Sequence, residues 1–307
     1  MRVVITGGTG MIGSALALSL ANDGHEVIIA SRNPRQVGPM PESIQFVEYD
    51  ADTAEGWAHV VDGADAVVNL AAANLDGGGF FPKRWTDERK KEILNSRLDV
   101  GNAVVQAIEQ AENKPRILIQ ASATDYYGVH PHNEVITETT PPGDSFLANV
   151  GKQWEASTVA VEDMGVRRCL IRTGLVFDDE KGVLPRFVFP FKLFVGGYFG
   201  SGKQSVPWIH IDDEVGAIRF LLDNDNLSGP FNLTAPNVVT NRELASAIGK
   251  VLRRPSFFWV PGLFFTLLFG EVGKLVLESQ RAVPARLQEA GYQFKFPDVE
   301  AALHDLY

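Results

Sequence analysis

Short apolar runs alternate with longer stretches of mixed polarity through the first two thirds of the chain. The first of these runs is too short for a helix, and continuous apolar runs of this kind are typical of strands buried on both faces. They are VVIT (3–6), VIIA (27–30), QFVEY (45–49), DAVVNLAA (65–72), ILIQAS (117–122) and RRCLIRTGLVF (167–177). Between these runs, residues 12–22 have helical spacing, and residues 86–111 form a long stretch of mixed polarity that suits a helix. This alternation predicts an α/β fold with a Rossmann-type, doubly wound parallel sheet.

Proline and aromatic residues become frequent in the last part of the chain. Two helices are expected there, over residues 212–224 and 240–254. The second begins with a threonine that is followed three residues later by a glutamate, which is the spacing of a capping box. We therefore expect a core over residues 1–177, to which later segments return. Residues 178–307 should mainly form a smaller C-terminal lobe.

The stretch most like a lipid-binding segment is FFWVPGLFFTLLFG, residues 257–270. It is too short to span a bilayer, and Pro261 and Gly262 interrupt it. We expect it to pack in the core or in a subunit interface. A helix that lies on a membrane surface is the alternative.

The composition argues against several classes of protein. The 307 residues carry a formal net charge of −10 without a block of basic residues, which argues against binding to nucleic acid or to an anionic membrane. The one cysteine, Cys169, cannot form an internal disulfide and is expected to be a buried thiol. The N-terminus leads directly into a strand without the features of a secretory signal, so we expect a cytoplasmic location.

A glycine-rich turn lies where the first predicted strand is followed by the first predicted helix. TGGTGMIG (6–13) carries Gly7, Gly10 and Gly13 at three-residue spacing, and this context makes the motif specific. Gly7 permits the tight turn, Gly10 lets the backbone approach a pyrophosphate, and Gly13 allows the helix to pack closely on the strand. The helix N-terminus offers free N–H groups to the phosphates. The motif predicts a dinucleotide site.

The end of the second predicted strand bears on the choice of dinucleotide. An NAD site usually has Asp or Glu near this point to hold the ribose 2′-hydroxyl. This chain has Ser31 and Arg32 there. Arginine can pair bidentately with a 2′-phosphate and serine can add a hydrogen bond, so we expect NADP(H) as the cofactor. An ordinary surface charge is the alternative for Arg32.

Several motifs together resemble the extended short-chain dehydrogenase/reductase class, which includes nucleotide-sugar epimerases and dehydratases. They are TGGTGMIG at the start, NLAA (69–72), YYG (126–128) and WIHIDD (208–213). More closely, the chain resembles an atypical branch of epimerase-like proteins. Its segments here are RWTDERKKEILNSR (84–97), FLANVGKQWE (146–155), GKQSVPWIHIDD (202–213) and a tail from GPFNLTAPNVVTNRE (229–243) to AGYQFKFPDVEAAL (290–303). The resemblance covers nearly the whole chain and implies a Rossmann-type core with a C-terminal substrate lobe.

The resemblance also implies which residues contact the cofactor and the substrate. The implied cofactor contacts are Gly7, Gly10, Met11, Ile12, Arg32, Asp50, Leu70, Ala71, Ala72, Gly174, Leu175 and Val176. The last three would lie beside the nicotinamide. The active-site serine or threonine of the class lies just upstream of its YG pair. This implies Ser122, with an apparent one-residue insertion, or else Thr124.

The proton relay of the class is absent from its usual place. In the wider class a tyrosine donates the proton, and a lysine four residues later lowers the pKa of that tyrosine. Counted back from Glu155, this pair falls on Leu147 and Gly151. No tyrosine of the chain is followed four residues later by a lysine. Lys152 is one position off, a rotation of about 100° on a helix, so we expect it to be a solvated charge.

Three interpretations remain open. The protein is an enzyme with a relocated acid, for which the candidates are Tyr126, Tyr127, Ser122 and His210. Alternatively, it is a reductase that takes its proton from water or from the substrate, or an NADP(H)-binding regulator without turnover. We favour an NADP(H)-dependent oxidoreductase or epimerase-like enzyme acting on an unidentified small molecule. In it Tyr126 would donate the proton and Ser122 would bind the substrate carbonyl.

The substrate side gives weaker indications. Polar and aromatic residues in the proline- and glycine-rich segment are candidates for substrate contacts: Arg186, Lys203, Gln204, Trp208 and His210. A surface or structural role is the alternative for these residues. We expect a small-molecule substrate, no metal, and no nucleic-acid or membrane partner, and we leave a homodimer open.

Overall fold

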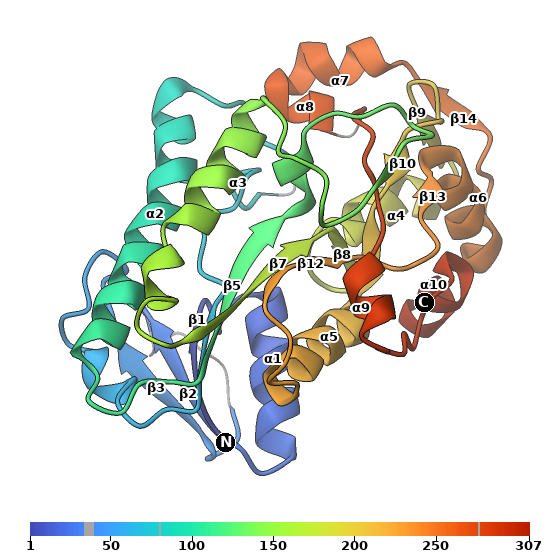
Figure 1. The fold of residues 1–307 in the computed structure, drawn as a ribbon. Coiled ribbons are helices and arrows are strands. Elements are labelled where there is room, and N and C mark those ends of the chain that lie inside the picture. Colours follow the sequence, from blue (N-terminus) through green and yellow to red (C-terminus); the bar gives the residue numbers. More distant parts are fainter. Residues whose placement is uncertain (34–39, 80, 276) are drawn as a thin grey trace.

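The computed structural model describes residues 1–33, 40–79, 81–275 and 277–307. A seven-stranded sheet with the order β12-β7-β5-β4-β1-β2-β3 forms its centre, and every neighbouring pair is parallel (Figure 1). Its strands are β1 (Arg2–Thr6), β2 (Glu26–Ser31), β3 (Ile44–Glu48), β4 (Ala66–Asn69), β5 (Ile117–Ala123), β7 (Arg167–Thr173) and β12 (Gly229–Leu233). The strand order changes direction at β1, and ligands of doubly wound sheets bind at such a point. The predicted Rossmann-type fold is confirmed.

Helices cover both faces of the sheet (Figure 1). They are α1 (Met11–Asn22) and α5 (Ile211–Asp223) on one face, and α2 (Asp87–Gln110) and α3 (Phe146–Ala156) on the other. Because successive side chains of a strand point to opposite faces, Val3 and Ile5 join the core that includes α1, while Val4 joins the core that includes α2. The sheet is therefore buried on both sides, as its apolar strands predict.

The segments that follow β7 build a smaller lobe, while α5 and β12 return to the sheet (Figure 1). The lobe contains β8 (Leu175–Phe177), α4 (Leu184–Lys192), β9 (Gly197–Phe199), β10 (Ser205–Val206), β11 (Trp208–His210), β13 (Val239–Thr240), α6 (Asn241–Leu252), β14 (Phe258–Val260), α7 (Gly262–Phe269), α8 (Glu271–Leu275), α9 (Ala285–Glu289) and α10 (Val299–Leu306). The remaining short elements are η2 (Ala58–Val60), η3 (Thr124–Tyr127), β6 (Val135–Ile136), η4 (Val159–Val161) and β15 (Arg281–Ala282). The expected capping box is present at the start of α6, where Thr240 and Glu243 each accept the other's backbone N–H.

The structure differs from the expected elements in two places. The apolar run 167–177 forms two strands, β7 and β8, which are separated by Gly174. The Pro207 carbonyl oxygen approaches this residue so closely that a Cβ on it would lie at 2.6 Å. The segment 257–270 does not pack in the core as a unit. It forms β14 and α7, and no residue of α7 is buried. Cys169 is buried as expected, and none of the described helices is long and apolar enough to cross a bilayer.

Candidate functional site

The residues expected to contact a cofactor lie in a row along one edge of the sheet. Each group follows the carboxyl end of a parallel strand. The glycine-rich turn follows β1, Ser31 and Arg32 lie at the end of β2, and Asp50 lies beyond β3. Residues 70–72 follow β4, and Gly174 follows β7. Open α/β sheets bind their ligands at this edge.

The glycine-rich turn forms a cradle that fits a pyrophosphate. Gly7 has a φ of +71°, and a Cβ on it would lie 2.7 Å from the backbone of Leu70 and Ala71. A Cβ on Gly13 would lie 2.4 Å from the Gly7 carbonyl oxygen, so α1 packs directly on the turn. Gly10 caps α1 without a side chain, which leaves the first N–H groups of the helix for a phosphate.

A lysine that the sequence analysis missed lies beside this turn. The loop between β8 and α4 brings the Lys181 ammonium to 3.5 Å from the Ser14 hydroxyl of α1. Asp178 shapes this loop by accepting the backbone N–H groups of Glu180 and Lys181. Lys181 is exposed, so it offers a positive charge near the N-terminus of α1. The sequence carries no signal for this contact, because the two residues are 167 positions apart.

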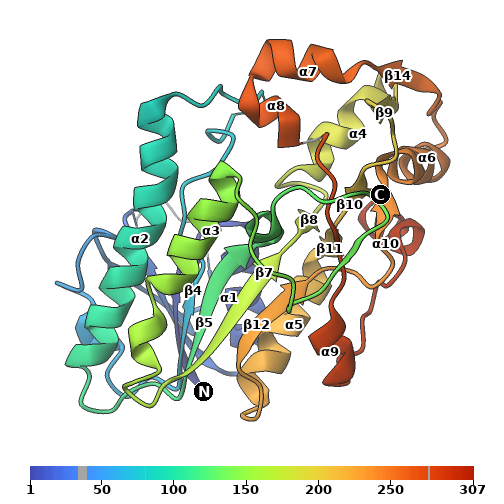
Figure 2. The ribbon, with the colours of Figure 1, turned by 45° about the horizontal axis from the view of Figure 1, so that its top comes forward.

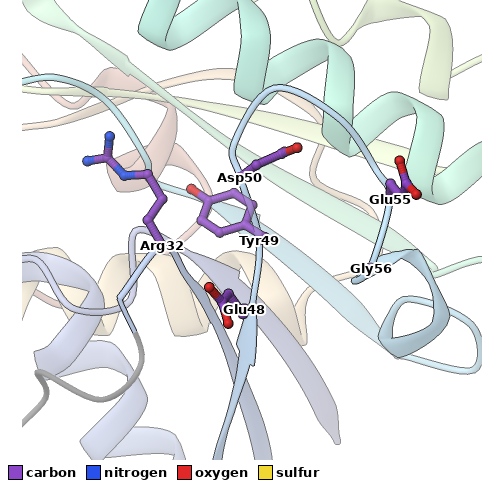
Figure 3. A pocket seen from close by; sticks show the side chains of 6 residues that line it. All are labelled: Arg32, Glu48, Tyr49, Asp50, Glu55 and Gly56. Atoms are coloured by element: carbon purple, nitrogen blue, oxygen red, sulfur yellow. The ribbon is translucent and has the colours of Figure 1, made fainter.

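A pocket of about 430 Å³ surrounds Arg32 at the ends of β2 and β3 (Figure 3). It is lined by Arg32, Glu48, Tyr49, Asp50, Glu55 and Gly56. Figure 3 shows the guanidinium directed away from the Glu48 carboxylate. Arg32 is exposed and forms no ion pair within the described part of the chain. Burial raises the pKa of Tyr49 to about 12, and the charge of Arg32 opposes this rise.

The Asp50 carboxylate is used by its own loop. It accepts the N–H groups of Thr53 at 2.9 Å and Asp52 at 3.0 Å, and the Thr53 hydroxyl at 3.1 Å. These bonds, that from the Thr53 N–H first, lower the pKa of Asp50. Ala51, with a φ of 76°, completes the turn. The Asp50 carboxylate is therefore occupied by its own loop, and a ligand would meet the backbone of this loop instead of a free carboxylate.

The RWT…SR segment, which leads into α2, holds the loop that follows β4. The Ser96 hydroxyl accepts the Ala73 N–H at 3.1 Å, and Arg97 donates to the Ala73 carbonyl at 3.3 Å. The Trp85 indole N–H donates to the Leu75 carbonyl at 2.8 Å. Arg97 is buried, and this burial lowers its pKa to about 10. These residues position the backbone of the loop that carries three of the implied cofactor contacts.

Ser122 belongs to a buried network. Its hydroxyl donates to Glu155 Oε1 at 2.7 Å, and Glu155 also accepts a bidentate pair from Arg172 at 2.8 and 2.9 Å. Arg172 donates to the Tyr127 hydroxyl at 3.0 Å, which donates to Asn232 Oδ1 at 2.6 Å. All five residues are buried. Because the hydroxyl proton of Ser122 is directed to Glu155, this arrangement does not support the expected hydrogen bond from Ser122 to a substrate.

Tyr126 lies against the position where the class has its lysine. Gly151 occupies that position on α3, and a Cβ on it would lie 3.4 Å from the Tyr126 Cα and Cβ. The guanidinium carbon of Arg172 lies 3.6 Å from the centroid of the Tyr126 ring. Among the described residues neither the Tyr126 hydroxyl nor the nearby Thr124 hydroxyl has a hydrogen-bond partner. The structure thus fixes the position of Tyr126. It leaves the hydroxyls of Tyr126 and Thr124 without a hydrogen-bond partner among the described residues.

An acidic residue next to Tyr126 was not singled out from the sequence. Burial, and then the charge of Glu278, raise the pKa of Asp125 to about 6, while Arg97 opposes the rise. Burial also raises the pKa of Glu278. Asp125 is therefore partly protonated near neutral pH. Its neighbours come from α2 and from the segment after α8, so only the fold brings them together.

Two residues expected on the substrate side are packed inside the lobe. Trp208 is fully buried, stacks on Phe177 at 5.4 Å and donates its indole N–H to the Asn237 carbonyl. Gln204 is buried and donates to the Phe199 carbonyl at 3.1 Å. These placements do not support substrate contacts for either residue. The burial of both side chains depends on segments that are distant in sequence.

Arg186 and His210 also have structural partners. Arg186 on α4 pairs with Asp76 in the loop after β4 and so links the lobe to the core. His210 is 1% exposed, and its Nδ1 accepts the Asp212 N–H at the start of α5. Burial lowers the pKa of His210. A substrate contact is therefore not supported for His210, and Arg186 would have to exchange Asp76 for a substrate.

One group of described residues could in principle hold a metal. His210, Asp212 and Asp305 bring one ligand atom each within 4.8 Å of one another. The Nδ1 lone pair of His210 already accepts the helix N–H, so in that tautomer Nε2 carries a hydrogen. Asp212 pairs with Lys295 at 2.6 Å. A metal would have to displace both contacts.

Comparison with known proteins agrees with this geometry. The NAD dependent epimerase/dehydratase family matches residues 3–234, and a domain of unknown function (DUF1731) matches residues 260–306. Epimerase family protein YfhF of Bacillus subtilis is 34% identical over 307 residues, which are 100% of this chain and 98% of that protein. An epimerase family protein of Staphylococcus haemolyticus is 37% identical over 308 residues, which are 99% of this chain and 98% of that protein.

Solved structures show the same likeness. Human epimerase family protein SDR39U1 (isoform 2), crystallised with NADPH, has a TM-score of 0.88 at 33% identity, covering 100% of this chain and 99% of that one. UDP-glucose 4-epimerase of Thermus thermophilus, in complex with NAD, has a TM-score of 0.76 at 20% identity, covering 98% and 96% of the two chains. The second likeness concerns the fold alone. The chain therefore belongs to the NAD-dependent epimerase/dehydratase family, whose fold binds a nicotinamide dinucleotide.

Proposed function

We propose that the protein is a cytoplasmic NADP(H)-dependent oxidoreductase that acts on a small carbonyl compound, with Tyr126 as the proton donor. The observation that carries the proposal is the placement of Tyr126 against Gly151, with the Arg172 guanidinium 3.6 Å from its ring. The phenol of Tyr126 would take the place of the missing Tyr-x-x-x-Lys pair as the proton donor. The cofactor, when bound, supplies or accepts the hydride.

The preference for NADP(H) rests on Arg32. Its guanidinium is exposed and has no carboxylate partner among the described residues, and it lies where the ribose 2′ position is expected. A charge-assisted, bidentate contact to a 2′-phosphate suits this residue. SDR39U1, which shares 33% of its sequence with this chain, was crystallised with NADPH. Lys181 and the N-terminus of α1 would hold the pyrophosphate.

The proposed chemistry needs few groups from the protein. The Thr124 hydroxyl, rather than that of Ser122, would donate a hydrogen bond to the substrate carbonyl. Tyr126 would give its phenolic proton to the carbonyl oxygen, and with the hydride that the bound cofactor would supply to the carbon the product would be an alcohol. Asp125, partly protonated near neutral pH, would return a proton to Tyr126 directly or through water.

Turnover of NADPH tests this proposal. Purified protein should oxidise NADPH with at least one member of a panel of aldehydes, ketones, enones and quinones. Tyr126→Phe should lower turnover by at least about 100-fold and leave NADPH affinity intact, because losing a positioned general acid costs about 10²–10⁴ in rate. Lys152→Ala is the matched control and should keep turnover nearly unchanged.

Two outcomes would contradict the proposal. A large loss with Lys152→Ala would mean that this lysine reaches the site. Tight NADPH binding without turnover on any compound would favour a non-catalytic regulator that responds to the cofactor. An epimerase-like activity would appear as racemisation of a chiral alcohol with the cofactor returned unchanged.

A further inference from the structure

The outer face of the lobe carries an unusually apolar helix. No residue of α7 is buried, although seven of its eight residues are glycine, leucine or phenylalanine. Leu263 is 68% exposed and Leu267 is 65% exposed, and Phe264 and Leu268 are exposed beside them. Figure 2 shows α7 at the periphery of the molecule, next to α8. A helix that is apolar all round is normally covered.

The apolar surface continues beyond α7. Phe257, Phe258 and Trp259 are exposed on and before β14, as are Leu193, Phe194 and Val195 after α4. β14 pairs with β9, which follows directly after the second of these groups. We call the exposed residues 193–195, 257–259, 263, 264, 267 and 268 the α7 surface. Exposed apolar residues gathered on neighbouring elements in this way are typical of a site of interaction.

The α7 surface is held in place. Arg84 donates to the Leu268 carbonyl at 3.0 Å, and Lys90 on α2 pairs with Glu271 on α8 at 2.7 Å. On the inner side of the helix, the Phe265 ring lies 4.7 Å from that of Phe199. The exposed leucines are therefore presented by a helix docked on both the core and the lobe. They do not belong to a loose tail.

The segment that carries most of the α7 surface has no acidic residue of its own. The protein has a net charge of −10, yet no Asp or Glu occurs between Glu243 and Glu271. Arg253 and Arg254 lie in this interval, and neither has a carboxylate partner within the described residues. Arg254 stacks on Phe194 at 4.4 Å, so the positive charge is part of the apolar surface.

We propose that the α7 surface docks the protein on an anionic lipid bilayer. Exposed Leu and Phe can enter the boundary of the acyl chains, a Trp suits the interface, and arginines suit anionic headgroups. A helix of eight residues is about 12 Å long and can only lie on the membrane. A second copy fits less well, because a two-fold dimer would bring the same basic residues together around the contact.

This departs from the expectation of no membrane partner, which rested on the net charge of the chain, and takes up the alternative that was left open for residues 257–270. Salt screens charges more than about 8 Å apart at physiological ionic strength. The charges near the contact therefore decide binding more than the net charge of the chain. The proposal does not depend on the activity proposed above.

Co-sedimentation with vesicles tests the proposal. The unmodified protein should pellet with phosphatidylcholine vesicles that contain phosphatidylglycerol, and pellet less with phosphatidylcholine alone or in high salt. Leu263→Glu/Leu267→Glu should lower the partition coefficient by at least about tenfold, as should Arg253→Glu/Arg254→Glu. Val129→Glu/Val159→Glu is the matched control, because it places the same charges on apolar residues exposed elsewhere, and it should bind normally.

Thermal melting shows whether each variant is folded, and light scattering shows the oligomeric state. The proposal is overturned if the unmodified protein stays in the supernatant with anionic vesicles. It is also overturned if Leu263→Glu/Leu267→Glu pellets normally. A protein that is dimeric in solution and becomes monomeric in this double variant would show that a second copy covers the α7 surface instead.

Discussion

The expected preference for NADPH over NADH depends on Arg32. A charge-assisted contact to the 2′-phosphate is worth about 1.5–3 kcal/mol, or roughly ten- to a hundredfold in affinity. We expect the protein to bind NADPH more tightly than NADH by this factor. Arg32→Ala should remove most of the difference, because it removes only the contact to the 2′-phosphate. Calorimetric titration with both cofactors measures it.

Lys181→Ala is the control for this prediction. The pyrophosphate is common to both cofactors, so loss of Lys181 should weaken NADPH and NADH by the same factor. Equal affinities of the unmodified protein for the two cofactors would refute the assignment of Arg32. A selective loss of NADPH affinity in Lys181→Ala would move the 2′-phosphate to that lysine.

At the residue scale, the role of a residue can be predicted from the sequence when its partners lie within a few positions of it along the chain. The roles of Gly7 and Gly13 follow from spacing within one turn, and the structure shows the close backbone approaches that they permit. The partners of Ser122 and Trp208 come from segments far along the chain, and neither was foreseen. The sequence identified the residue types at the sheet edge, but not which hydroxyls remain available.

At the scale of elements, the Glu155–Arg172 pair joins α3 to β7. Both side chains are buried, and Ser122 adds a third hydrogen bond to the carboxylate. Glu155→Ala would leave the Arg172 guanidinium without its charge partner in the protein interior. Breaking a buried pair in this way costs about 3–5 kcal/mol. We expect the free energy of unfolding in urea to fall by that amount.

The pair between Glu162 and Arg168 provides the comparison. Its carboxylate is half exposed, and such pairs are worth at most about 1 kcal/mol. Glu162→Ala should therefore change the free energy of unfolding much less than Glu155→Ala. Similar losses in the two variants would mean that water reaches Glu155 and that the network is not an interior one.

The strands of the sheet could be predicted because they are continuous apolar runs between polar segments, and the pattern needs no knowledge of tertiary contacts. The break at Gly174 could not be predicted, since it reflects the approach of the Pro207 carbonyl from another segment. Nor could the sequence decide whether α7 is exposed, because its composition suits both a core helix and a helix on a membrane surface. The composition of a helix shows how apolar it is, but it does not show whether other segments cover the helix.

At the scale of the whole molecule, Glu214 couples folding to pH. It is fully buried on α5, it accepts a hydrogen bond from Thr173 at 2.8 Å, and its second oxygen has no partner among the described residues. Burial raises the pKa of Glu214 from 4.5 to about 8. In the unfolded chain this carboxyl ionises above its ordinary pKa, whereas in the folded protein it stays neutral up to about 8.

Between these two pKa values Glu214 is protonated in the folded protein and ionised in the unfolded chain, so unfolding releases a proton. The free energy of unfolding therefore falls as the pH rises, by at most about 1.4 kcal/mol per pH unit. Above about pH 8 the loss is complete. Glu214→Gln keeps the shape and cannot ionise, so it removes this loss. The variant should match the unmodified protein in urea unfolding near pH 4.5 and exceed it increasingly towards pH 8. Asp125 titrates in both proteins and cancels in the difference. A stability difference that does not change with pH would mean that Glu214 is ionised in the folded protein and has a partner that offsets its burial.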